Sequence, residues 1–199
     1  MQPVIEHRPV STPALRVRQV DPTTDPRWAA FVASHPNGLA FHHPAWLATL
    51  ADTFDFAPVH LACEDEHGAL HGVLPLFYRR GLLRGRQLWS LPYTPIAGPL
   101  ARSRAAVGAL VHAAAELAGA TAGQRLQIHS ELPDLAVNDV PFLRVDWYPN
   151  YVIDLPDRSE ALRFSKSRRR GIAKAVRAGV RVRDAERVTD VHAWYDLYV

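Results

Sequence analysis

Short stretches of alternating apolar and polar residues recur along this chain, and segments with helical signals lie between them. Residues 15–20 and 59–63 alternate in this way, and residues 70–78 follow the second run after a turn at residues 64–68. Alternation predicts a half-buried strand, and two such runs joined by a short turn predict an antiparallel hairpin. The pattern therefore predicts a mixed α/β (α+β) fold, in which helices flank a largely antiparallel sheet.

Start and stop signals place the helices between these strands. Pro26 suits the first turn of a helix, Ser103 is a good N-cap, and Gly179 suits the position just after a helix. Helices are predicted over residues 26–33, 44–54, 103–118 and 188–199, and from residue 157 or 159 to 178. Further strands are predicted over residues 87–91, 126–129, 150–155 and 180–183, with a loop over residues 79–86. Pro75 predicts an edge or a bulge within residues 70–78.

The composition limits the cellular setting. The chain has 199 residues, 48% of them hydrophobic, and one cysteine, Cys63, which excludes an internal disulfide. The N-terminal residues lack the apolar core of a signal peptide, and no apolar run approaches the about 20 residues of a membrane span. These features predict a soluble, cytoplasmic protein. His67 and His71 follow Cys63 at steps of four, but across a strand and a turn, so no metal site is predicted.

The positive charge is concentrated in one segment. The formal net charge is only +3, yet nine basic and no acidic residues lie between Arg163 and Arg183, while the rest of the chain carries 14 basic and 20 acidic residues. A basic segment on a mildly acidic body predicts a site for an acidic partner. The alternative is a solvated helix face without a ligand.

On a helix, five of these cations fall on one stripe because they follow one another at steps of 3, 4, 4 and 3. They are Arg163, Lys166, Arg170, Lys174 and Arg177. Like charges at this spacing destabilise a helix, and an anionic ligand would relieve that cost. Lys166, Arg170, Lys174 and Arg177 are therefore the candidate phosphate-binding residues. Leu162, Ile172 and Val176 lie on another face of the same helix and are predicted to pack against the body.

Three other residues are candidates for lining a cleft. Tyr93 and Thr94 lie in a Pro-rich loop after a predicted strand, a place where binding sites often form. Trp46 lies in the first turn of the predicted helix over residues 44–54. No residue of this chain stands out as a catalytic acid, base or nucleophile.

Three stretches together resemble one protein family. Residues 41–46 read Phe-His-His-Pro-Ala-Trp, and residues 68–77 form a hairpin return that leads to Gly98-Pro99. Residues 165–180 are similar to the pattern Ser-Lys-x-x-Arg-x-x-Ile-x-Lys-Ala…Gly-Val. In order and spacing these stretches resemble the FemAB-like peptidyltransferases, which are tandem GNAT-fold proteins of bacterial cell-wall biogenesis.

The resemblance implies a domain organisation. Residues 12–156 would form a first GNAT-like domain, and residues 157–199 a basic junction helix with the start of a truncated second one. The helix over residues 188–199 ends on an apolar and aromatic face without a cap, which also predicts that the chain continues. The family's reactive centre lies mainly in the second domain, so the resemblance names no catalytic residue here.

The resemblance also implies a function. Known members transfer an amino acid from aminoacyl-tRNA to a peptidoglycan precursor, so we expect an acyl- or aminoacyltransferase that forms an amide on a cell-envelope precursor or a related amine. By position, Arg177 matches an arginine that contacts the precursor's phosphates. Peptidoglycan-bridge members carry a lysine about four residues after the equivalent of Trp46, where this chain has Leu50.

Two alternative functions stay open. The first is an N-acetyl- or N-acyltransferase that uses acyl-CoA or an acyl-carrier protein; residues 168–173 fit its Arg-x-x-Gly-x-Ala loop, but inside a predicted helix. The second is a non-catalytic basic module that binds RNA or an anionic surface. Candidate donors are aminoacyl-tRNA and acyl-CoA. Candidate partners are a phosphate-bearing small molecule or lipid-linked substrate, tRNA and the inner membrane surface, while the oligomeric state is left open.

Overall fold

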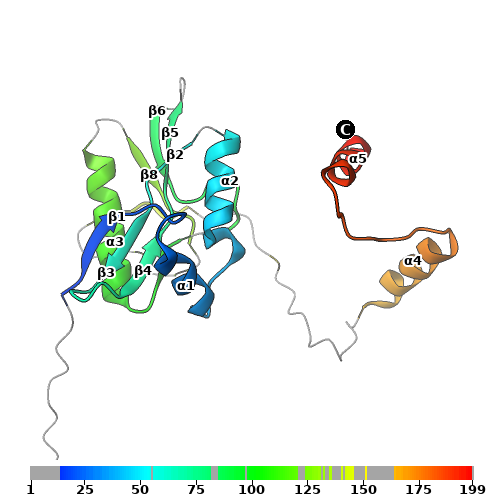
Figure 1. The fold of residues 1–199 in the computed structure, drawn as a ribbon, viewed down its shortest axis with the longest axis horizontal. Coiled ribbons are helices and arrows are strands. Elements are labelled where there is room, and N and C mark those ends of the chain that lie inside the picture. The colour runs from blue at the N-terminus through cyan, green and yellow to red at the C-terminus, as the bar shows by residue number, and fades with distance from the viewer. Residues whose placement is uncertain are drawn as a thin grey trace, which may run out of the picture. The chain divides into compact units, whose positions relative to one another are not determined.

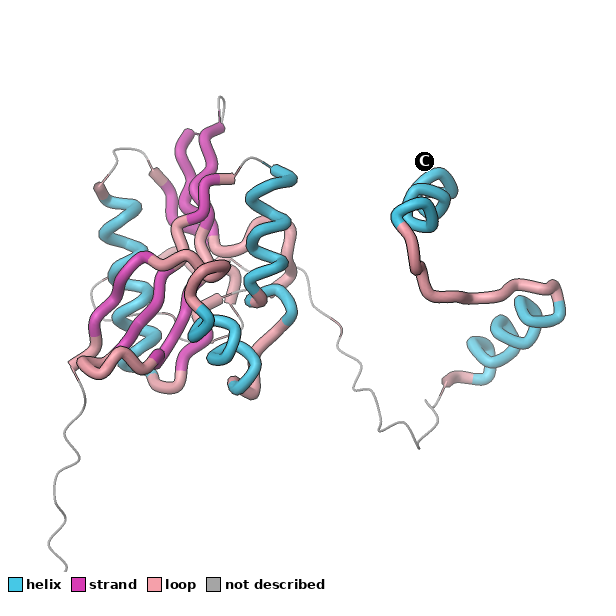
Figure 2. The backbone as a smooth tube through the Cα atoms, in the orientation of Figure 1, coloured by secondary structure: helices cyan, strands magenta, loops and turns pink. Residues whose placement is uncertain are grey.

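The computed structural model describes residues 14–198 except positions 55, 82–84, 97, 121–123, 131, 133–134, 136–139, 141, 146–150 and 152–163. The chain divides into two compact units, Met1–Tyr148 and Pro149–Val199 (Figure 1). The first unit contains the described strands and three α-helices, and the second contains two α-helices joined by an extended segment (Figure 2).

Strands form the middle of the first unit. One sheet has the order β1 (Arg16–Gln19), β3 (Leu61–Glu64), β4 (Leu70–Leu74) and β7 (Leu100–Ala101). The other has the order β2 (Ala57–Pro58), β5 (Phe77–Gly81), β6 (Gly85–Trp89) and β8 (Arg125–Gln127). Neighbouring strands are antiparallel, except that β6 and β8 are parallel. The predicted mixed fold with a largely antiparallel sheet is therefore confirmed.

A short irregular region links the two sheets. The Val59 N–H donates to the Leu76 carbonyl oxygen at 2.9 Å, and the Leu76 N–H donates to His60 Nδ1 at 3.2 Å. Pro75 has no N–H with which to continue the ladder, so the single strand predicted over residues 70–78 is divided into β4 and β5. The loop predicted over residues 79–86 is also wrong, because β5 and β6 pair in register as far as Gly81 and Gly85.

The helices of the first unit begin where the sequence predicted. They are α1 (Pro26–Ser34), α2 (Pro44–Phe54) and α3 (Arg104–Gly119), with the short 3-10 helix η1 (Ala40–His42) before α2. An Asp25 carboxylate oxygen accepts the Arg27 N–H at 3.1 Å, and Ser103 Oγ accepts the Ala106 N–H at 3.2 Å. Each cap satisfies a backbone donor that the first turn of a helix leaves without a partner.

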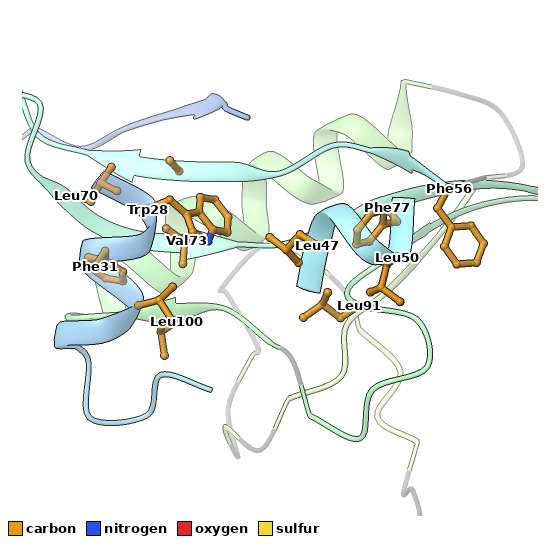
Figure 3. Packing of buried hydrophobic residues seen from close by; sticks show 12 residues of the cluster. Trp28, Phe31, Leu47, Leu50, Phe56, Leu70, Val73, Phe77, Leu91 and Leu100 are labelled. Carbon is orange, nitrogen blue, oxygen red and sulfur yellow. The ribbon is translucent and has the colours of Figure 1, made fainter. Parts of the chain in front are cut away.

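The alternation of side chains along β3 and β4 gives the sheet two apolar faces. Ala62 and Val73 belong to a core with α1 and α2, in which Trp28, Phe31, Leu47 and Leu50 are buried (Figure 3). Leu61, Cys63 and Leu74, which are next to Ala62 and Val73 in the sequence, belong to a second core together with residues of α3. Its buried residues are Leu61, Cys63, Leu74, Leu76, Leu88, Ala106, Leu110, Ala114 and Ala118. Helices therefore cover both faces of the strands, with α3 on one side and α1 and α2 on the other (Figure 1).

The second unit contains α4 (Lys166–Arg177) and α5 (Val188–Tyr198). The predicted start of α4 at residue 157 or 159 is wrong, because Ser165 caps the helix: its Oγ accepts the Arg168 N–H at 3.4 Å. Gly179, with a φ of 79°, follows the end of α4 as predicted.

Residues 180–183 do not form the predicted strand, because no other described segment pairs with them. Almost all of the strand predicted over residues 150–155 lies outside the described residues, as do Leu162 and Arg163. Within the part of the chain that the structure describes, no helix is long and apolar enough to cross a membrane.

Candidate functional site

The four candidate phosphate-binding residues lie together on α4. Lys166, Arg170, Lys174 and Arg177 fall within an arc of about 80° around the helix axis, given 3.6 residues per turn. All four side chains are exposed. We call these four residues the α4 cationic face. Ile172 lies on the opposite side of the helix and is also exposed in this unit, although the sequence predicted that it packs against the body.

The cations of α4 have no acidic partner among the described residues, in contrast to Arg18, Arg27 and Arg183. Arg27 donates to Asp25 at 2.6 Å and to Glu64 at 3.0 Å, and Arg183 donates to Asp190 at 2.5 Å. Among the described residues, no carboxylate lies within ion-pair distance of a basic residue of α4. The α4 cationic face therefore keeps its full charge for an external anion.

Arginine and lysine suit phosphate in different ways. The Arg170 and Arg177 guanidinium groups are planar forks that match two oxygens of a phosphate, while the Lys174 ammonium acts as a compact point charge. Crowding like charges at steps of three and four costs a few tenths of a kcal/mol per pair. A bound anion would offset this cost.

The loop after β6 holds Tyr93 and Thr94 in very different environments. Thr94 is buried, and its Oγ1 donates to the Leu91 carbonyl oxygen at 2.8 Å, so its hydroxyl holds the turn together instead of lining a cleft. The Tyr93 side chain is 61% exposed. Leu91 and Tyr93 have φ values of 47° and 61°, a left-handed conformation that is uncommon for residues with bulky side chains.

His129 fastens this loop to the end of β8. Its Nε2 lies 3.3 Å from Trp89 Nε1 and 2.8 Å from Gln127 Nε2. Because an indole N–H can only donate, Nε2 must be the acceptor, and the protonated Nδ1 donates to the Thr94 carbonyl oxygen at 3.4 Å. Burial lowers the pKa of His129, and the hydrogen bond to Thr94 opposes this only in part. His129 is thus a neutral histidine, and both of its ring nitrogens form hydrogen bonds.

Sequence reasoning did not single out His129. The alternation over residues 126–129 indicated only a strand, whereas the role of this histidine depends on partners up to 40 residues away. Its pairing with the indole of Trp89 becomes visible only once β6 and β8 lie side by side.

Trp46 lies elsewhere, beside a shallow hollow between α1 and α2. The hollow has a volume of about 570 Å³, and its lining includes His35, Leu39, His43 and Thr49. Trp46 packs edge-on against Phe41, with ring centroids 5.6 Å apart. Its buried Nε1 has no hydrogen-bond acceptor among the described residues.

The candidate residues therefore do not converge on one cleft within the first unit. Neither Tyr93 nor Thr94 lines the hollow beside Trp46. Tyr93 instead contacts Phe54 at the C-terminal end of α2, whereas Trp46 belongs to its first turn. The predicted cleft lining is thus divided between two places on the first unit.

The described residues include no group of three or more His, Cys, Asp or Glu side chains that could hold a metal ion. Of the three residues considered for metal, Cys63 is buried in β3, and burial raises the pKa of its thiol. His71 is engaged with Asp65, since its Nε2 lies 2.9 Å from a carboxylate oxygen.

Comparison with known proteins gives limited further information. No family model matches the chain, and no curated protein matches it. Among solved structures, it is similar to the aminoglycoside antibiotic 6'-N-acetyltransferase AAC(6')-Ih from Acinetobacter baumannii, with 13% identity and a TM-score of 0.43 over 70% of this chain and 99% of that one. A possible acetyltransferase from Clostridium difficile 630 matches with 12% identity and a TM-score of 0.43 over the same shares. At this level the likenesses assign neither a family nor a reaction to the chain.

Proposed function

We propose that this chain is part of an acyl- or aminoacyltransferase of the FemAB-like class, which forms an amide on a phosphate-bearing cell-envelope precursor or a related amine. The α4 cationic face would hold the phosphate of that substrate. The proposal draws on the three sequence stretches that resemble this family and on the mixed fold of the first unit. The observation that carries it is the acid-free cationic face of α4.

The reaction itself asks the protein mainly for positioning. The amine nitrogen forms a bond to the acyl carbon, and the C–O bond of an ester or the C–S bond of a thioester breaks. The proton that leaves the amine passes to a base or to the departing oxygen or sulfur. Bringing the two substrates together in the right orientation supplies much of the acceleration. Binding the acceptor through its phosphates, away from its amine, serves this purpose.

Binding of inorganic pyrophosphate tests the role of the α4 cationic face. Arg170→Ala, Lys174→Ala and Arg177→Ala are each expected to weaken the Kd about tenfold in titration calorimetry, since each removes a charge-assisted contact. Arg168→Ala is the matched control, because Arg168 belongs to the same helix but lies on its other side. Equal losses for Arg168→Ala and Arg177→Ala would mean that only net charge matters and would contradict the proposal.

The acyl donor is tested separately on the complete protein. An aminoacyltransferase is expected to transfer the amino acid of aminoacyl-tRNA to an amine, whereas an acyl-CoA-dependent enzyme would release free thiol from acetyl-CoA. A non-catalytic basic module would show neither reaction and would bind polyanions with steep salt dependence. Turnover with either donor that survives loss of all four α4 cations would refute a role for this face in substrate binding.

A further inference from the structure

The strands of the second sheet carry arginines and no acidic residue at one end of the sheet. Residues 77–91, which include β5 and β6, contain four arginines and no Asp or Glu, and residues 117–130, which include β8, contain one arginine and no Asp or Glu. Strand pairing brings four of these five arginines to the same end of the sheet. They are Arg79, Arg80, Arg86 and Arg125. We call these four residues the arginine end.

The hairpin of β5 and β6 continues past its neighbouring strands. β2 pairs with β5 only at Phe77 and Tyr78. β8 pairs with β6 only from Gln87 onward, whereas β5 and β6 stay paired as far as Gly81 and Gly85. Among the described residues, no other strand pairs with this last part of the hairpin, and it projects beyond α2 and α3 (Figure 1). The arginine end therefore includes a projecting two-stranded ribbon.

The register places the arginines on both faces of the sheet. Arg79 lies opposite Gln87, and Gln87 lies opposite Arg125, so these three residues share one face. Arg80 lies opposite Arg86, and this pair belongs to the other face, because successive residues of a strand alternate between faces. A small anion would meet the arginines of one face only. The arrangement therefore fits an extended anionic partner that reaches both faces.

The charges of the arginine end are not neutralised within the part of the chain that the structure describes. No described carboxylate lies within ion-pair distance of Arg79, which is half-buried, or of Arg125, which is exposed. Arg80 and Arg86 are direct cross-strand partners, and like charges at such positions destabilise the pairing of the two strands. An anionic partner would offset this cost.

From these observations we propose that the arginine end docks on an anionic membrane surface. A layer of anionic headgroups surrounds the end of a projecting ribbon and so meets both of its faces, and its negative potential attracts clustered arginines. The residues between Gly81 and Gly85 lie outside the described residues, but their sequence is Leu82-Leu83-Arg84. Apolar residues next to cations strengthen binding to an anionic membrane, whereas the phosphates of a nucleic acid offer them no apolar surroundings.

The docking surface goes beyond the proposed function, because it belongs to the first unit and requires neither the acyl donor nor the α4 cationic face. It describes contact with the membrane surface and not a membrane span. Charge alone brings the chain to the lipid, so the contact is expected to weaken as the salt concentration rises.

Sedimentation of the full chain with lipid vesicles tests the docking surface. The parent chain is expected to bind vesicles made of equal amounts of phosphatidylcholine and phosphatidylglycerol, and not vesicles of phosphatidylcholine alone. Arg125→Gln is expected to weaken binding to the anionic vesicles about fivefold, and the double variant Arg80→Gln/Arg86→Gln about 25-fold. The double variant Arg80→Lys/Arg86→Lys keeps both charges and is expected to retain most of the binding.

A second double variant controls for net charge. Arg16→Gln/Arg104→Gln removes the same number of charges from the first unit, and Arg16 on β1 and Arg104 at the start of α3 are both exposed. It is expected to bind anionic vesicles almost as well as the parent chain. Equal losses in the two glutamine double variants would mean that only net charge matters and would overturn the proposal. Unchanged binding in Arg80→Gln/Arg86→Gln would overturn it as well.

Urea unfolding checks that the loss of binding is not a loss of fold. The midpoint of Arg80→Gln/Arg86→Gln is expected to equal or exceed that of the parent chain, because the two like charges no longer face each other across the strands. Arg125→Gln provides an independent test from another strand, so unchanged vesicle binding in that variant also contradicts the docking surface.

Two further measurements separate this surface from other partners and from the proposed function. If Arg80→Gln/Arg86→Gln lost affinity for an RNA duplex and kept its affinity for anionic vesicles, the partner would be a nucleic acid and the proposal would be wrong. Pyrophosphate binding by the α4 cationic face is expected to stay unchanged in the variants of the arginine end. Failure of the proposed function and failure of this docking surface therefore give different results.

Discussion

Replacing Trp28 by alanine is expected to lower the free energy of unfolding of the first unit by about 3–5 kcal/mol. The Trp28 side chain is fully buried between α1 and the sheet, among Phe31, Val73 and Leu100 (Figure 3). Its Nε1 donates to the His42 carbonyl oxygen at 2.9 Å and so fastens α1 to η1. The alanine variant loses the packing of the largest core side chain and also leaves a buried carbonyl oxygen without its donor.

Urea unfolding followed by far-ultraviolet circular dichroism measures this loss. Trp28→Phe is expected to cost less, because phenylalanine keeps much of the apolar volume and loses only the hydrogen bond and the remaining ring atoms. Trp194→Ala serves as the control, since Trp194 is 62% exposed on α5. If Trp28→Ala destabilised the chain no more than Trp194→Ala, the first core would not depend on this indole as described.

Local signals in the sequence predicted the helices of the first unit well. Pro26 begins α1 and Ser103 caps α3 as expected, and Gly179 follows α4 with the left-handed φ that favours glycine. These signals work because a cap and its backbone partner lie within three residues of each other. Strand pairing is different, since it depends on segments that are far apart in the chain.

The errors in the sequence analysis follow from this difference. The Arg-rich segment over residues 79–86 looked like a loop, yet its ends pair in the hairpin of β5 and β6. Alternation over residues 180–183 looked like a strand, yet no described neighbour completes a ladder there. In both cases the outcome depended on whether another segment pairs with the one in question. Local periodicity carries no information on such a pairing partner.

The candidate site was also predictable only in its local features. The α4 cationic face follows from helical spacing alone, so all four of its residues could be found from the sequence. The loop carrying Tyr93 and Thr94 could be found too, but the spacing of residues does not reveal that Thr94 is buried while Tyr93 is exposed. That difference comes from the left-handed turn and from the hydrogen bond that His129 makes to the loop.

The stability of the first unit is expected to fall as the pH drops from 6.5 to 4, because of His60. The His60 side chain is 3% exposed and lies against Phe77 and Trp28, and its Nδ1 accepts the Leu76 N–H. Burial lowers the pKa of His60 to about 4, although the nearby Asp21 carboxylate acts in the opposite direction. In the unfolded chain the pKa of histidine is about 6.5.

The unfolded chain therefore binds more protons than the folded chain throughout this window. The contribution of His60 is fully present above pH 6.5, is lost progressively as the pH falls, and is completely lost below pH 4. The difference of about 2.5 pKa units corresponds to a loss of about 3 kcal/mol. His60→Asn removes the titrating ring while its side-chain oxygen can still accept the Leu76 N–H, so its free energy of unfolding should depend less on pH by this amount.

Urea titrations at several pH values between 4 and 7 provide the measurement. His60→Asn is expected to be less stable than the parent chain at pH 7, because asparagine fills less of the core, and the two stabilities are expected to converge as the pH approaches 4. His67→Asn is the matched control, since the His67 side chain is 83% exposed on the turn between β3 and β4. A constant difference between His60→Asn and the parent chain at every pH would show that the imidazole of His60 titrates alike in the folded and unfolded chain. The junction between the two sheets would then be open to water, and the buried contact of His60 with the Leu76 N–H could not be a lasting part of the fold.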